Sequence, residues 1–365
     1  MSQNDRQNSD KTPVFVIMAG GFGTRFWPLS TKENPKQFLD LFGHRSLLQQ
    51  CFDRISGLTS PDRVLVLTNQ SLTPLVRKHL PELPEDNIIG EPARRDTAAA
   101  VALAAFICRE RYGRVTMAVL AADHLIEPRG LFTKTLLSAV RAAEAGEKLY
   151  TFGISPTYPA TGYGYLELGE CLDNDNEIKH FKLISFKEKP DFDTARNYLE
   201  SGRYRWNSGM FVWRTDTIIN EIKQHLPQHY DAFTELIPSY RTPAWEERLQ
   251  ATFEALKPIS IDFGVMEKAR HVSCVSCSFN WSDVGGWPAL DGLLDQCGEG
   301  NSARGQLVTH QAGGNLVYAQ DESEQVALVG VSNLIVVRAG KQTLIVPKDR
   351  AEEIKHLVAK LQDAN

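Results

Sequence analysis

Apolar runs and helical stretches alternate along the first third of the chain. Residues 14–20 form an apolar run that ends in glycine, and residues 63–69 and 115–123 repeat this strand-like pattern. Residues 46–55 and 97–112, which lie between these runs, have the pattern of helices. Strands separated by helices of this length favour a mostly parallel sheet with right-handed crossovers.

The middle of the chain is less regular. Strands are predicted over residues 161–170, 181–191 and 206–214, and helices over residues 193–202 and from about Asp216. These segments extend the sheet of the first third, so we expect one α/β domain with a mixed, mostly parallel central sheet flanked by helices.

From about Asn301 the pattern changes to short β-branched runs, which are typical of an all-β segment. A final helix is predicted in residues 349–362, with Asp349 as its cap. Its apolar stripe is formed by Ile354, Leu357, Val358 and Leu361. We therefore expect a catalytic domain over residues 13–295 and a small β domain, closed by a helix, over residues 301–365.

Composition narrows the class of protein. The 365 residues leave room for two or three domains, and 42% hydrophobic with 23% charged residues is ordinary for a globular protein. The net charge of −5 argues against nucleic-acid binding, so anionic ligands must be held by local cations. No apolar run is long enough to span a membrane, and residues 1–12 resemble a disordered tail rather than a signal peptide. We expect a cytoplasmic protein.

The cysteines do not indicate a metal site. One group of possible zinc ligands is formed by His271, Cys274 and Cys277, but the second pair of ligands that a zinc site normally needs is missing. The segment also has a strand pattern, in which positions three apart point to opposite faces. Reduced, partly buried thiols are expected there.

The glycines that follow the first apolar run indicate a phosphate site. Gly21 and Gly23 fit the start of a dinucleotide-binding fingerprint, but its third glycine is replaced by Phe26, and no P-loop pattern occurs. Glycines expose backbone N–H groups to an anion, while Arg25 adds a fork of donors and Lys36 a point charge. The glycines alone would fit a tight turn equally well, but the two cations favour phosphate binding.

Two aspartates follow strand-like segments that are far apart in the chain. Asp123 ends the run at 115–123, and Asp283 lies just before two glycines. In an open parallel sheet, ligands bind outside the carboxyl ends of the strands. Mg²⁺ prefers one or two carboxylates together with phosphate oxygens and water. Each aspartate alone would also suit a turn or a helix cap.

Other polar residues are candidates for holding a base or a sugar. Asp96 and Thr97 begin an alanine-rich helix, where they would act as an N-cap and could face a polar ligand. Glu188 beside Lys189 would suit a phosphorylated sugar, although a solvated charge run is the simpler interpretation. Asn207 adds a donor and an acceptor on a strand.

Taken together, these motifs resemble those of the mannose-1-phosphate guanylyltransferases, also called GDP-mannose pyrophosphorylases, of the sugar nucleotidyltransferase superfamily. The likeness runs from about Pro13 to the final helix, with the motifs in the family's order. The motifs are GGFGTRFWPLS, PKQF, EPARRDTAAA, AADH, TGYGY, FKEKPD, WNSGMF, SIDFGVMEK and WSDVGGW. The chain resembles the short, monofunctional bacterial form, because it ends before a fused phosphomannose isomerase domain could fit.

The resemblance implies a Rossmann-like nucleotidyltransferase domain, a β-helix-like tail that contributes to a homodimer, and a role for each motif. Arg25 and Lys36 would be the catalytic cations, and Asp123 and Asp283 would bind Mg²⁺ with support from Asp262. The residues around GTP would be Gly20, Gly21, Gly23, Thr24, Asp96 and Thr97. The residues around mannose 1-phosphate would be Gly162, Glu188, Lys189 and Asn207.

The implied reaction is an in-line attack by a phosphate oxygen of mannose 1-phosphate on the α-phosphorus of GTP, giving GDP-mannose and pyrophosphate. Positioning and charge neutralisation would carry the catalysis, because the nucleophile is already ionised. Two alternatives stay open: a related enzyme with another sugar 1-phosphate or base, and a non-catalytic sugar-nucleotide-binding subunit. All the proposed ligand residues precede Asn301, so the tail is expected to serve assembly rather than chemistry.

Overall fold

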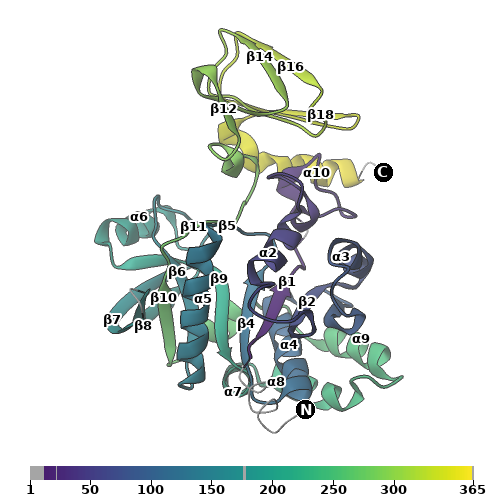
Figure 1. Cartoon of the computed structure of the whole chain (residues 1–365), viewed down its shortest axis with the longest axis vertical. Helices are drawn as coiled ribbons and strands as arrows, with labels where there is room; N and C mark the ends of the chain where they lie inside the picture. The colour runs from purple at the N-terminus through teal and green to yellow at the C-terminus, as the bar shows by residue number, and fades with distance from the viewer. Residues whose placement is uncertain (1–11, 22, 176–177, 364–365) are drawn as a thin grey trace. The chain divides into compact units, whose positions relative to one another are not determined.

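The chain folds into two compact units that are not consecutive in sequence (Figure 1, a computed structural model). The structure describes residues 12–21, 23–175 and 178–363, so the disordered tail predicted for residues 1–12 lies almost entirely outside the described residues. The first unit, here called the α/β unit, comprises Met1–Gly20, Cys51–Ala122 and Ile126–Trp281. The second, the tail unit, comprises Gly21–Gln50, Asp123–Leu125 and Ser282–Asn365.

The α/β unit is built on a nine-stranded sheet with the order β3-β2-β1-β4-β9-β6-β10-β8-β7. Strands β8 and β9 run opposite to the rest, which confirms the mixed, mostly parallel sheet. Its strands are β1 (Val14–Met18), β2 (Val64–Asn69), β3 (Ile88–Glu91), β4 (Thr116–Ala121), β6 (Leu149–Ile154), β7 (Tyr165–Asp175), β8 (Ile178–Lys187), β9 (Tyr204–Arg214) and β10 (Val272–Ser276). The short strands β5 (Leu125–Glu127) and β11 (Asn280–Ser282) lie where the chain passes from one unit to the other.

Helices flank this sheet. They are α2 (Leu47–Ile55), whose first turn belongs to the tail unit, α3 (Thr73–His79), α4 (Asp96–Tyr112), α5 (Arg129–Glu144), α6 (Phe192–Ser201), α7 (Thr215–His225), α8 (Pro227–Leu236) and α9 (Trp245–Ala255). All strands and helices predicted for this part of the chain are confirmed, with ends that shift by a few residues. The strand predicted from residue 161 begins only at Tyr165.

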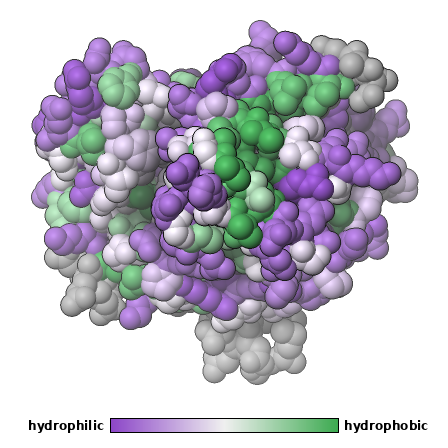
Figure 2. All heavy atoms as spheres, turned by 90° about the horizontal axis from the view of Figure 1, so that it is seen from above, coloured by the Kyte–Doolittle hydropathy of each residue, from purple (hydrophilic) through white to green (hydrophobic). Residues whose placement is uncertain are grey.

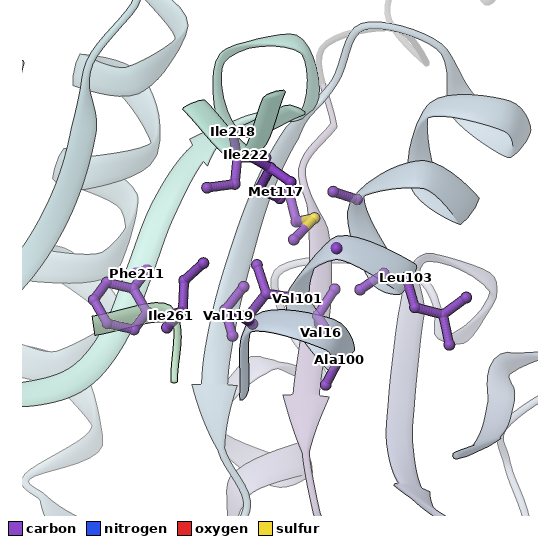
Figure 3. Packing of buried hydrophobic residues seen from close by; sticks show 14 of the residues in the cluster. Val16, Ala100, Val101, Leu103, Met117, Val119, Phe211, Ile218, Ile222 and Ile261 are labelled. Carbon is purple, nitrogen blue, oxygen red and sulfur yellow. The ribbon is translucent and has the colours of Figure 1, made fainter. Parts of the chain in front are cut away.

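Helix α4 occupies the centre of the core. Its residues Ala98–Cys108 are buried on every side, which fits a helix that has no polar face in this stretch. Figure 3 shows Val16 and Val119, from β1 and β4, gathered with Val101 of α4. The alanines allow this close approach because they add little volume between helix and sheet.

The tail unit carries a β-helix-like fold. Its larger sheet has the order β12-β13-β15-β17-β18, and β14 pairs with β16 in a second sheet. The strands are β12 (Asp295–Cys297), β13 (Asn301–Arg304), β14 (Gln306–His310), β15 (Leu316–Ala319), β16 (Gln325–Val329), β17 (Leu334–Ala339) and β18 (Gln342–Pro347). Strands β13, β15 and β17 are mutually parallel, as are β14 and β16, so the chain coils through the two sheets in turn.

Alternate side chains of this coil face two different cores. Val317 and Val336 pack inside the coil with Leu328. The neighbouring Leu316 and Ile335 face outward into a second cluster. That cluster also contains the N-terminal residues Phe26, Leu29, Leu39, Leu41 and Leu47, together with Trp287, Ile354 and Val358. The segment Gly21–Gln50 therefore shares its core with the tail, which is why the two form one unit.

The closing helix confirms one expectation and corrects another. Helix α10 runs over Ile354–Asp363, and Lys348–Glu353 form a separate 3₁₀ helix, η10. Asp349 lies inside η10, so the prediction that it caps the final helix is wrong. The predicted apolar stripe is divided: Ile354 and Val358 are buried, whereas Leu357 and Leu361 are exposed.

Candidate functional site

Gly23 brings the glycine loop against Lys36. Its φ is +51°, and an added Cβ would collide with the Cβ of Lys36, so no other residue fits there. Beside this contact, Gln37 donates a hydrogen bond of 2.9 Å to the backbone oxygen of Gly21. The glycine loop and the lysine, thirteen positions apart in sequence, thus form one structure within the tail unit.

Lys36 joins the two aspartates that were predicted as metal ligands. Its buried ammonium donates a hydrogen bond of 2.7 Å to Oδ2 of Asp123 and another to the backbone oxygen of Asp283. Burial by itself would raise the pKa of Asp123, but the charge of Lys36, with smaller contributions from His124 and the hydrogen bonds, holds that pKa below its ordinary value. The Asp123 carboxylate is therefore ionised, as a metal ligand must be.

The donor set at this point fits a hard divalent cation. Asp123 and Asp283 offer carboxylate oxygens, and the residues described here contain no group of three or more His, Cys, Asp or Glu side chains that could hold a metal. Mg²⁺ typically takes one or two carboxylates and completes its shell with phosphate oxygens and water. The pair fits that pattern, with most of the shell left to a substrate.

Arg25 also belongs to the tail unit. It lies in the short 3₁₀ helix η1 (Thr24–Phe26), and its side chain is about half exposed. The guanidinium contacts Glu352 and the backbone oxygen of Gly285. The structure thus brings Arg25, Lys36, Asp123 and Asp283 together in one unit.

The start of α4 differs from the predicted cap. Asp96 has a left-handed φ of 62°, and its Oδ1 accepts a hydrogen bond of 2.7 Å from the N–H of Thr97. The N-cap position is Arg95, which makes no side-chain cap, so the prediction of Asp96 and Thr97 as a conventional N-cap is wrong. The hydroxyl of Thr97 instead accepts a hydrogen bond of 2.8 Å from the N–H of Ile261.

Glu91 is a candidate that the sequence analysis missed. It is the last residue of β3, and desolvation raises the pKa of its carboxyl to about 8. Its Oε1 lies over the bare backbone of Gly20, where an added Cβ would be 3.9 Å away. Within the described residues, nothing forms a hydrogen bond or an ion pair with this carboxyl group. The signal was a glutamate directly after the apolar run at 88–90, at the carboxyl end of a parallel strand.

A second group of polar side chains lies in the α/β unit around Asn207. Its Nδ2 donates 3.0 Å to Oδ1 of Asp262, and its Oδ1 accepts 2.8 Å from the hydroxyl of Thr151. Desolvation, followed by the nearby charge of Glu188, raises the pKa of Asp262 to about 7. Asp262 begins a π-helical turn, Asp262–Met266, a conformation that is frequent at functional sites.

Glu188 presents an acceptor with no protein partner in the described chain. Its Oε1 lies 3.1 Å from the ammonium of Lys189, while its Oε2 is buried without a hydrogen bond. A Cβ at Gly164 would collide with that Oε2, so the glycine makes room for the carboxylate. Gly162, by contrast, is exposed and has no neighbour within 4 Å of an added Cβ. A buried carboxylate oxygen without a donor suits a hydroxyl-rich ligand.

Aromatic rings border this second group. Tyr163 lies between Trp206 and Trp281, with ring centroids 5.1 Å and 5.3 Å away, and Tyr158 lies 4.9 Å from Trp206. Tyr158 is 51% exposed. Tyr163 belongs to the motif at 161–165, and the two tryptophans come from β9 and β11.

The two cysteines of the rejected zinc pattern lie in β10 and just after its end. Cys274 lies in β10, and it and Cys277 are both free and buried. Burial raises the pKa of both thiols, that of Cys274 to about 12. The sequence predicted reduced, partly buried thiols, and both cysteines are free and buried.

Comparison with known proteins adds a family to this geometry. A family model described as "Nucleotidyl transferase" matches residues 14–295, and one described as "MannoseP isomerase/GMP-like beta-helix domain" matches residues 305–361. A mannose-1-phosphate guanylyltransferase of Salmonella montevideo is 41% identical over 96% of this chain and 74% of its own length. One from Escherichia coli K12 is 37% identical over 95% of this chain and 73% of its own.

A solved structure is similar over nearly its whole length. It is described as a mannose-1-phosphate geranyltransferase from Thermus thermophilus, and the two chains are 33% identical with a TM-score of 0.86. The match covers 96% of this chain and 99% of that one. Among the described residues, no helix has the length and apolar character needed to cross a membrane.

Proposed function

The chain belongs to the mannose-1-phosphate guanylyltransferase family of nucleotidyl transferases, and we propose that it transfers GMP from GTP to α-D-mannose 1-phosphate, giving GDP-mannose and pyrophosphate. The observation that carries this proposal is the junction of the glycine loop, Lys36, Asp123 and Asp283 within the tail unit. Three segments far apart in sequence supply the glycine backbone, the cation and the carboxylates that a nucleoside triphosphate and its metal require. The cytoplasmic location expected from the sequence remains part of this proposal.

The family generally uses a divalent metal, and we assign Mg²⁺ to Asp123 and Asp283. The ion would neutralise charge on the phosphates as the α-phosphorus is attacked. Lys36 keeps the Asp123 carboxylate ionised and holds it beside the backbone of Asp283. Bound phosphates would offer the ammonium further acceptors, so Lys36 can serve both the metal site and the triphosphate. Arg25 stabilises the leaving pyrophosphate, with Gly20, Gly21, Gly23 and the backbone of Thr24 around the phosphates.

Glu91 is assigned to the base. The Watson–Crick edge of guanine offers two neighbouring N–H donors, which match the two oxygens of a carboxylate, whereas adenine presents an acceptor at N1. Donors directed at the carboxylate favour its ionised form, so guanine would lower the raised pKa of Glu91. Asp96 and Thr97 remain proposed neighbours of the base, through the backbone at the start of α4.

The group around Asn207 is assigned to mannose 1-phosphate. Glu188 and Asp262 would accept hydrogen bonds from sugar hydroxyls, Asn207 would orient them, and Lys189 would neutralise the phosphate. The contact between Asp262 and Asn207 supports a role for Asp262 in the sugar site, rather than the supporting role at the metal that the family resemblance implied. Gly162 is assigned to the loop that covers the sugar.

The reaction needs no general base, because the attacking phosphate oxygen is already ionised. Catalysis then depends on holding that oxygen in line with the α-phosphorus and on neutralising the leaving pyrophosphate. Most of the residues proposed for pyrophosphate and metal lie in the tail unit, Gly20 being the exception, and those proposed for the base and the sugar lie in the α/β unit.

A screen of purified protein tests the reaction. GTP, ATP, dTTP and UTP would each be paired with mannose 1-phosphate and glucose 1-phosphate, with pyrophosphate release as the readout. We expect turnover chiefly with GTP and mannose 1-phosphate. Turnover with another pair would identify a related enzyme, and binding of sugar nucleotide without turnover in any pair would favour a regulatory subunit.

Glu91→Gln tests the base assignment. The wild type should prefer GTP over ITP, which lacks the 2-amino group, and the variant should lose roughly a hundredfold in kcat/KM for GTP while discriminating less between the two. Glu85→Gln, at an exposed carboxylate that pairs with Arg77, is the matched control and should behave as wild type. An unchanged GTP-to-ITP ratio in Glu91→Gln would remove Glu91 from the base site.

A homodimer formed through the tail completes the proposal. Figure 2 shows hydrophobic residues gathered in a patch on one face of the molecule. In the tail unit, Val308, Val329 and Ile345 are 51%, 67% and 64% exposed on the strands of the coil. A second copy of the chain is the occupant that the family resemblance favours. Light scattering should give twice the monomer mass, and a Val329→Lys variant should dissociate.

A further inference from the structure

A carboxylate near the C-terminus holds Arg25. The Nε of Arg25 lies 3.2 Å from Oε2 of Glu352, and its Nη1 donates a long hydrogen bond of 3.5 Å to the backbone oxygen of Gly285. The carbon stem of Arg25 passes over Gly286, where an added Cβ would be 3.5 Å from the Cβ of Arg25. Two distant segments of the tail unit thus set the direction of one guanidinium.

The backbones on both sides of this ion pair are anchored in the same core. Phe26, the residue after Arg25, is fully buried, and its ring centroid lies 5.1 Å from that of Trp287. On the other side, Ala351 directly precedes Glu352 and Ile354 follows two positions later, and both belong to the cluster that contains Phe26. The two side chains therefore extend from backbone whose neighbouring residues are buried in one core.

The neighbouring charges leave Glu352 directed to Arg25. Glu353 is bound by Arg350 through two hydrogen bonds of 2.7 Å and 2.6 Å. This bidentate pair satisfies both of those side chains. Glu352 is then the carboxylate of η10 that the structure pairs with Arg25.

We propose that Glu352 is a positioning residue for Arg25 in the transfer reaction, an inference that rests on the proposed function. With Nε occupied by Glu352, the Nη2 group has no partner in the described part of the chain and is left to bind an anion. A guanidinium held in place before the substrate binds loses less freedom when it meets the pyrophosphate. The Arg25 side chain is 47% exposed and that of Glu352 69% exposed, so the pair acts through orientation rather than through stability.

Removal of the carboxylate tests the inference. Glu352→Ala should lower kcat roughly tenfold with an unchanged KM for mannose 1-phosphate. The kcat of Glu352→Gln should lie between those of the wild type and Glu352→Ala, because the amide oxygen of the glutamine can still accept a hydrogen bond from Nε of Arg25. Arg25→Ala combined with Glu352→Ala should be no slower than Arg25→Ala alone, since Glu352 acts only through Arg25. Glu353→Ala, the adjacent carboxylate, is the matched control and should keep wild-type kinetics.

Pyrophosphate binding, measured by calorimetry, supplies a readout that needs no turnover. Glu352→Ala should bind pyrophosphate several-fold more weakly than Glu353→Ala at the same unfolding midpoint. Tighter binding of pyrophosphate by Glu352→Ala would show that Glu352 competes with phosphate for Arg25. Equal binding by the two variants would show that Glu352 neither positions Arg25 nor competes for it. Either result overturns the inference. A wild type that binds pyrophosphate but does not turn over GTP would instead contradict the proposed function.

Discussion

Lys36 shows how one side chain connects the segments of the proposed site. It is buried, its ammonium pairs with the carboxylate of Asp123, and it also donates to the backbone oxygen of Asp283. The cost of burying its ammonium is offset by these two acceptors, as buried charges require. The glycine at position 23 is what allows this approach.

If both aspartates hold one Mg²⁺, Asp123→Asn and Asp283→Asn should each slow turnover about a thousandfold, which is several kcal/mol of lost electrostatic stabilisation. The double variant should be little slower than either single one, because both serve the same ion. Steady-state pyrophosphate release at saturating GTP measures this. Asp295→Asn, at an exposed carboxylate of β12 in the same unit, is the control. A near-normal rate for one of the two single variants would exclude that aspartate from the metal site.

Asp262 carries a cost in stability that depends on pH. Desolvation and the charge of Glu188 raise its folded pKa from 3.8 to about 7. Because the folded state holds this proton more tightly than the unfolded chain, the stabilisation is present below about pH 4 and is lost as the pH rises to about 7. Above that pH, the ionised and desolvated carboxylate destabilises the fold.

At pH 8, Asp262→Asn should therefore increase the free energy of unfolding by on the order of a few kcal/mol and raise the unfolding midpoint. Near pH 4 the substitution should have little effect on stability. Its amide oxygen can still accept from Asn207. The same variant should raise the KM for mannose 1-phosphate, because a sugar acceptor has changed. Thermal unfolding at the two pH values is the measurement, with the exposed Asp193→Asn as control. A stabilisation of equal size at both pH values would contradict the raised pKa.

At the scale of elements, the β-helix-like tail is held by a ladder of buried asparagines at its turns. Oδ1 of Asn301 accepts from both the N–H and the Nδ2 of Asn315, at 2.9 Å and 3.0 Å. Oδ1 of Asn315 in turn accepts 2.9 Å from the N–H of Leu334, one coil further on. Both asparagines are completely buried. Side-chain amides thus replace the backbone pairing that is interrupted where the chain turns between strands.

Asn315→Ala should destabilise the protein by about 2–4 kcal/mol, because it leaves the N–H of Leu334 buried without an acceptor and removes two further hydrogen bonds. Urea unfolding followed by circular dichroism would measure the change. Gln306→Ala, at an exposed position on β14, should shift the midpoint much less. Equal effects of the two substitutions would show that the ladder adds nothing beyond ordinary strand packing.

At the scale of the whole molecule, the tail is connected more closely to the proposed site than the sequence suggested. The tail was expected to serve assembly because every proposed ligand residue precedes Asn301. In the structure, the strands of the tail and α10 pack in one core with Phe26 and Leu29, which follow Arg25 in the sequence. Glu352 of the tail contacts Arg25 itself. The tail therefore packs against the proposed phosphate loop within the same unit.

Truncation after Gly300 should then do more than dissociate a dimer. It would expose the apolar residues of Gly21–Gln50 that pack on the tail, so the unfolding midpoint should fall by many degrees. Any soluble fraction should bind GTP markedly more weakly than the full chain. Calorimetric titration with GTP and light scattering measure the two effects. A truncated protein with full-length stability and GTP affinity would show that the phosphate loop is independent of the tail.

The sequence by itself determined the elements and the family. The apolar runs at 14–20 and 63–69 correspond to β1 and β2, because a buried strand requires consecutive apolar residues. The alanine-rich stretch at 97–112 corresponds to α4, whose pattern is equally local in the sequence. The ordered motifs were enough to identify the guanylyltransferase family before any geometry was available.

Only the tertiary structure decided which charges meet. Lys36 and Asp123 are 87 positions apart, and Asn207 and Asp262 are 55 apart, so no periodicity in the chain connects them. The raised pKa of Glu91 and the pairing of Arg25 with Glu352 likewise depend on burial and distances that arise only after folding. Local patterns specify backbone conformation because it depends on near neighbours, whereas the electrostatics of a site depend on which distant segments pack together.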